Sequence, residues 1–120
     1  MQSILIAGGD LRQARLAGML TERGYEVHMA GFDKLRIPDD WPRTADWVFL
    51  PVPYKAPDGS LKAPFSNNKL ALSDIALRYP VSAYLLGGAD AQTRTLLDGH
   101  RVFDLLADEA FLVYNALLTA

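Results

Sequence analysis

Two residues of opposite charge, Asp10 and Arg12, follow Gly8 and Gly9 at the end of an apolar segment. Glycines between a strand and a helix can let the backbone approach a phosphate, as in sites that bind a dinucleotide cofactor. The G-x-G-x-x-G pattern is absent, however, because Arg12 and Gln13 stand where small residues are needed. A carboxylate at Asp10 would cap the helix and repel phosphate, so this chain is predicted to bind no nucleotide cofactor.

Arg12 is the first candidate for ligand binding. A guanidinium near the start of a helix can hold a ligand carboxylate through two hydrogen bonds. Many arginines on helices simply lie in solvent, and this second interpretation of Arg12 remains open.

Three further polar side chains are candidates for binding a small polar ligand. Ser66 and Asn67 follow a proline-rich segment and would either hydrogen-bond that ligand or form a local turn. Asn115 falls on the apolar stripe of a predicted helix, where a buried amide must find partners in a loop or a ligand. His28 and His100 have no acid or serine at a diagnostic spacing, and no metal-ligand spacing occurs, so we assign no general base and no metal.

Alternating strands and helices must position these residues. Apolar runs ending in glycine, proline or aspartate predict five strands and the helices between them. The expected strands are 4–7, 25–30, 47–50, 81–86 and 101–104, and the expected helices are 11–23, 74–79, 91–97 and 107–120. Asp10 should cap the first helix and Ser73 the second.

Two connections depart from this alternation. Prolines and aspartates in residues 34–46 favour a connection that crosses the sheet without a long helix. Residues 51–68 are proline-rich and irregular, with a hairpin tip expected at Asp58 and Gly59. The predicted fold is one α/β domain over residues 1–120, a doubly wound, flavodoxin-like or Rossmann-like parallel sheet of order 2-1-3-4-5.

Composition restricts the classes of function. The 120 residues include 12 basic and 14 acidic side chains, without long runs of either sign, which disfavours nucleic-acid and membrane partners. There is no cysteine, which excludes disulfides and thiolate zinc sites and fits a cytoplasmic protein. No apolar run is long enough to span a membrane.

The ordered set of short motifs resembles the N-terminal domain of the dipicolinate synthase A subunit. The resemblance covers nearly the whole chain and rests on several segments taken together. These segments are 4–10 with Arg12 and Gln13, then 31–33, 50–52, 65–67 and 114–115.

This resemblance implies a role in making dipicolinate, the calcium chelator of the spore core, from an intermediate of the lysine pathway. The family works in the mother-cell cytoplasm as an NAD(P)-dependent oxidoreductase, and its A subunit is paired with a B subunit. The A subunit resembles a two-domain dehydrogenase in which a substrate-type domain precedes a nucleotide-binding domain.

Residues 1–120 would correspond to the first of these two domains, and the C-terminal nucleotide-binding domain is absent from the chain. We therefore expect no dehydrogenase turnover from this chain alone. The positions that match the family's motifs would bind a small dicarboxylate substrate: Gly8, Gly9, Asp10, Arg12, Ser66, Asn67 and Asn115.

The alternative is a stand-alone, non-catalytic α/β module that binds a ligand or a protein, with a homo-oligomer possible. A phosphoreceiver domain is disfavoured, because Leu50 and Pro51 occupy the place of its phosphoacceptor aspartate.

Overall fold

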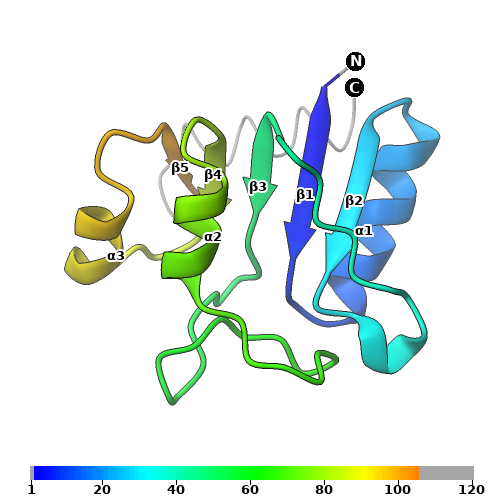
Figure 1. Cartoon of the computed structure of the whole chain (residues 1–120), viewed down its shortest axis with the longest axis horizontal. Coiled ribbons are helices and arrows are strands. Elements are labelled where there is room, and N and C mark those ends of the chain that lie inside the picture. Colours follow the sequence, from blue (N-terminus) through cyan, green and yellow to red (C-terminus); the bar gives the residue numbers. More distant parts are fainter. Residues whose placement is uncertain (1, 106–120) are drawn as a thin grey trace.

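The computed structural model describes residues 2–105, which form a parallel sheet of five strands in the order β2-β1-β3-β4-β5 (Figure 1). This is the predicted strand order. The strands are β1 (Ser3–Ala7), β2 (Glu26–Ala30), β3 (Trp47–Phe49), β4 (Ala83–Leu86) and β5 (Val102–Asp104). The helices are α1 (Leu11–Glu22), α2 (Leu72–Arg78) and α3 (Ala91–Leu96), with a single 3₁₀ turn, η1 (Asp33–Leu35).

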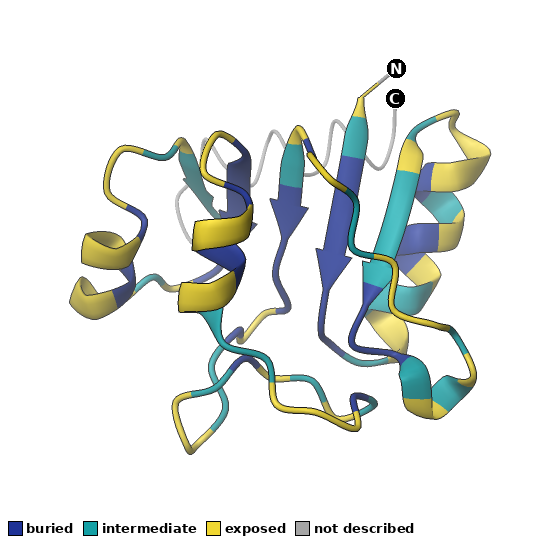
Figure 2. Ribbon diagram, viewed as in Figure 1, coloured by how far each residue is buried: buried dark blue, intermediate teal, exposed yellow. Residues whose placement is uncertain are grey.

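The central strands are buried on both faces, and this burial explains their continuous apolar sequences. All four residues of β4 and the last four of β1 are buried. The edge strand β2 alternates between apolar and polar residues and is only half-buried over most of its length. In Figure 2 the buried colour accordingly runs through the middle of the sheet.

Helices cover the two faces of the sheet. Leu16 and Leu20 of α1 pack with Ile4 and Ile6 of β1 on one face. On the other face, a second core includes Ile75 of α2 and Leu97, the residue that follows α3. These two apolar layers hold the carboxyl ends of the strands in place, so the residues that follow β1 and β3 lie at a common edge.

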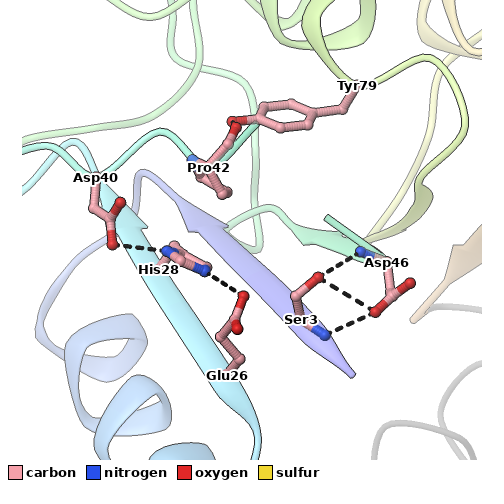
Figure 3. Close-up of polar contacts among 7 residues, drawn as sticks. All are labelled: Ser3, Glu26, His28, Asp40, Pro42, Asp46 and Tyr79. Carbon is pink, nitrogen blue, oxygen red and sulfur yellow. Dashed lines mark hydrogen bonds and ion pairs between the residues drawn. The ribbon is translucent and has the colours of Figure 1, made fainter. Parts of the chain in front are cut away.

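A crossover segment (residues 36–46) takes the place of a helix between β2 and β3, as the sequence predicted. The His28 ring on β2 is hydrogen-bonded to Asp40 of the segment at 2.7 Å and to Glu26 at 2.8 Å (Figure 3). At the far end, Asp46 accepts a hydrogen bond from the backbone N–H of Ser3 at 2.8 Å. Polar contacts at Asp40 and Asp46 therefore fix this segment to β2 and β1.

The predicted start of the second helix was wrong by two residues. Helix α2 begins at Leu72, and Ala71 occupies the cap position without a side-chain hydrogen bond, so Ser73 is not the cap. Leu72 packs against the core of its face, which favours helical backbone two residues earlier than the capping pattern indicated. Asp74 does lie in the first turn, as predicted.

Other boundaries follow the sequence closely. Asp10 and Asp90 cap α1 and α3 through hydrogen bonds from backbone N–H groups. The predicted helix 107–120, including Asn115, lies outside the described residues. Within residues 2–105, no helix has the length and apolar character that crossing a bilayer requires.

Candidate functional site

A pocket of about 330 Å³ opens at the carboxyl edge of the sheet, between the residues that follow β1 and β3. The chain leaves neighbouring strands in opposite directions at this point, and open α/β sheets bind their ligands at such a switch point. We call it the switch-point pocket. It is lined by Gly9, Asp10, Arg12, Gln13, Leu16, Phe49, Leu50, Pro51, Val52, Pro53, Lys62, Pro64, Leu85 and Leu105.

The glycine turn uses its backbone donors inside the protein. Gly8 has φ +74° and donates its N–H to the carbonyl of Ala30 at 2.8 Å. Gly9 has φ +106° and donates its N–H to the carbonyl of Lys62 at 2.9 Å. Both N–H groups are therefore occupied by protein carbonyls. A Cβ at Gly8 would lie 3.0 Å from the Lys62 carbonyl oxygen, so the missing side chain lets the loop approach.

Asp10 caps α1 with its side chain. Its Oδ1 accepts from the backbone N–H of Arg12 at 2.9 Å. Hydrogen bonds from the Arg12 side chain and backbone hold the pKa of Asp10 below its usual value, and the positive charge of Lys62 contributes further. The carboxylate is therefore ionised at neutral pH, where its charge would repel an anion beside it.

Arg12 turns back onto Asp10. Its Nε lies 3.2 Å from both carboxylate oxygens, and its Nη2 lies 3.1 Å from Oδ2. The side chain is 77% exposed, so solvent screens this ion pair and the pair is weak. Arg12 thus lines the pocket, but one edge of its guanidinium is already occupied by a carboxylate.

Sequence reasoning did not identify Lys62, the third ionisable residue of the pocket. Lys62 belongs to the β3–α2 connection (residues 50–71), and its carbonyl is the acceptor for Gly9. No local pattern in the sequence signals this placement, which depends on hydrogen bonds between distant segments.

Ser66 and Asn67 lie away from Arg12. They line a shallower depression formed by residues 56–69 and contribute nothing to the wall of the switch-point pocket. The Ser66 hydroxyl donates to the Asn68 carbonyl at 2.6 Å, which is a local turn contact. Of the seven predicted positions, the structure places Gly9, Asp10 and Arg12 on the pocket wall.

Asn67 joins the β3–α2 connection to η1, the turn that follows β2. Its backbone N–H and side-chain amide donate to the two carboxylate oxygens of Asp33, each at 2.9 Å. These bonds lower the pKa of Asp33. In this structure Asn67 therefore positions a loop.

The first part of the β3–α2 connection, near β3, is fixed to α3. Buried Tyr54 donates its hydroxyl hydrogen to Thr93 Oγ1 at 2.8 Å and accepts from the N–H of Asp90 at 3.3 Å. Lys55 pairs with Asp90 at 2.7 Å, and this contact with the helix cap lowers the pKa of Asp90 to about 2. The predicted hairpin tip is present, since Lys55 and Leu61 form an antiparallel bridge around Asp58 and Gly59.

The described residues hold no group of three or more histidine and acidic side chains arranged to bind a metal ion. The pocket wall is mainly apolar, with its charges at Asp10, Arg12 and Lys62. Such a site can bind a small acid with an apolar body, and it offers no nucleophile–base pair of its own.

Comparison with known proteins gives a consistent result. The family model for the N-terminal domain of the dipicolinate synthase A subunit matches residues 3–98. A search of curated protein sequences returned no match.

Two solved structures are similar in fold. The A chain of dipicolinate synthase from Bacillus subtilis has a TM-score of 0.75 and 25% sequence identity, over 97% of this chain and 44% of that chain. The corresponding chain of dipicolinate synthase from Bacillus halodurans has a TM-score of 0.75 and 21% identity, over 96% of this chain and 44% of that chain. The chain therefore spans less than half the length of these relatives.

Proposed function

Because the chain belongs to the family of N-terminal domains of the dipicolinate synthase A subunit, we propose that it forms the substrate side of an oxidoreductase that makes dipicolinate. The switch-point pocket would hold the dihydrodipicolinate-type dicarboxylate that is oxidised. The observation that carries this proposal is an apolar pocket at the switch point with two cations, Arg12 and Lys62, in its wall.

The pocket's size and chemistry support a small cyclic acid. Its volume of about 330 Å³ is near the lower end for ligand sites, about 300–1,000 Å³. Apolar side chains such as Phe49, Leu50 and Leu85 suit the faces of a ring, while cations suit its carboxylates. The chain's own part in the reaction is then to bind and orient the acid.

The glycine turn does not fit a nucleotide. Its N–H groups are bonded to Ala30 and Lys62, and the Asp10 carboxylate lies beside it. We infer that NAD(P) binds to a second domain, in the part of the longer relatives that this chain does not match. No step of hydride transfer is assigned to residues of this chain.

The wider setting follows from the same family membership. The names of the solved relatives distinguish an A chain of the synthase, which implies an enzyme of more than one kind of polypeptide. As the partner we propose the B subunit, with action in the mother-cell cytoplasm during sporulation.

Binding of pyridine-2,6-dicarboxylate to the 120-residue chain tests the proposal. Amide NMR shifts should change first at Gly9, Asp10, Arg12 and Lys62, and neutral pyridine, as the control, should leave them unchanged. Absence of binding, or shifts confined to residues 66–69, would refute the assignment of the pocket. Turnover of the dihydro substrate with NADP by this chain alone would refute the assignment of the cofactor to another domain.

A further inference from the structure

The three ionisable side chains of the switch-point pocket are not equivalent. Asp10 and Arg12 form a pair whose charges cancel. Among the described lining residues, Lys62 then leaves a net charge of one positive unit. The charge that attracts an anion to this pocket is therefore that of Lys62.

The three lysines of the β3–α2 connection also differ in their partners. Lys55 pairs with Asp90 at 2.7 Å, and Lys69 pairs with Asp58 at 2.5 Å. Among residues 2–105, no carboxylate forms an ion pair with the ammonium group of Lys62. A ligand that binds Lys62 therefore breaks no ion pair among the described residues.

The backbone of Lys62 is held on both sides although its side chain is exposed. Its N–H donates to the Tyr54 carbonyl at 2.8 Å, and its carbonyl accepts from Gly9 at 2.9 Å. These bonds fix the Cα of Lys62 at the rim of the pocket. The entropic cost of presenting the ammonium group to a ligand is then limited to the side chain.

We propose that Lys62 is the main carboxylate-binding residue of the switch-point pocket, and that Arg12 contributes less because Asp10 competes with the ligand for it. This inference rests on the proposed function, which supplies the small dicarboxylate. Arg12 can use its Nε edge for a ligand only by giving up the contacts of 3.1–3.2 Å to Asp10. Lys62 would bind one carboxylate directly.

Titration calorimetry of the 120-residue chain with pyridine-2,6-dicarboxylate at low salt tests this assignment. Lys62→Met keeps most of the aliphatic side chain and removes the charge, and it should weaken binding about fivefold to tenfold. Arg12→Met should weaken binding less than Lys62→Met. Lys69→Met is the matched control, from the same connection but outside the pocket wall, and it should change the affinity less than twofold.

The outcomes separate the inference from the function. If the unaltered chain binds and Lys62→Met binds equally well, the role of Lys62 is refuted while the proposed function stands. An equal loss in Lys69→Met would also overturn the role, because it would indicate general attraction by surface charge. If the unaltered chain fails to bind, the proposed function fails and this inference with it. An amide NMR spectrum of each variant confirms that it is folded.

Discussion

Substitution of Asp10 should separate the stability of α1 from the affinity of the pocket. Asp10→Ala removes the oxygen that accepts from the Arg12 N–H at 2.9 Å, and loss of such a cap costs about 1 kcal/mol. For a domain of this size that corresponds to a decrease in Tm of about 4 °C. Asp10→Asn keeps an oxygen in the same place, since asparagine caps helices as well as aspartate does, so its Tm should stay near that of the unaltered chain.

In affinity, unlike in stability, the two Asp10 variants should behave alike. Both substitutions remove the carboxylate that pairs with the Arg12 guanidinium and repels an anionic ligand. Both variants should therefore bind pyridine-2,6-dicarboxylate severalfold more tightly at low salt, and the gain should shrink at 1 M salt, where charges are screened beyond about 3 Å.

Thermal unfolding followed by circular dichroism and calorimetric titration together measure these two effects. Weaker binding by Asp10→Asn would show that the carboxylate assists the ligand, which contradicts the competition argued for Arg12. An unchanged Tm for Asp10→Ala would show that the cap contributes nothing to the stability of α1.

Three other substitutions test contacts elsewhere in the fold. Partial burial opposes the charge of His28, but hydrogen bonds to its two carboxylate partners outweigh this effect and raise its pKa. The stabilisation by charged His28 should therefore be complete below pH 6.5 and be lost as the pH rises through the raised pKa. A plot of Tm against pH should fall over this range for the unaltered chain but not for His28→Gln. Parallel plots for the two proteins would contradict the assignment. Tyr54→Phe should lower the free energy of unfolding in urea by about 1–2 kcal/mol, because the buried hydroxyl of Thr93 loses its donor; an unchanged value would show that this bond is not stabilising. Gly9→Ala should lower it by about 1–3 kcal/mol, because its φ is +106° and a Cβ would lie 2.3 Å from Gln13 Cγ; full stability would show that the turn can relax.

Features that depend on neighbouring residues could be predicted from the sequence. The apolar run of β4 and the capping aspartate Asp10 are local signals, and the structure confirms them. The strand order could be predicted because apolar runs alternate with helical patterns, which is typical of a doubly wound parallel sheet. The start of α2 was predicted wrongly, because packing of Leu72 outweighed a local capping preference.

The site was predictable only in part. The glycine turn and Arg12 could be located because they follow a strand, and strand ends share an edge of the sheet. The partner of Arg12 is a side-chain conformation, and the position of Lys62 depends on a bond between residues 9 and 62. Neither property leaves a pattern along the chain.

The two glycines after β1 form no phosphate-binding turn in this pocket. In nucleotide-binding turns, glycines let a phosphate approach backbone N–H groups. Here the carbonyls of Ala30 and Lys62 approach instead, and they take the same donors. The N–H groups of these two glycines are therefore not available to an anionic ligand, and the bond that consumes the N–H of Gly9 is the one that fixes Lys62 at the rim. The loss of a phosphate site and the placement of the carboxylate-binding lysine thus have one structural cause.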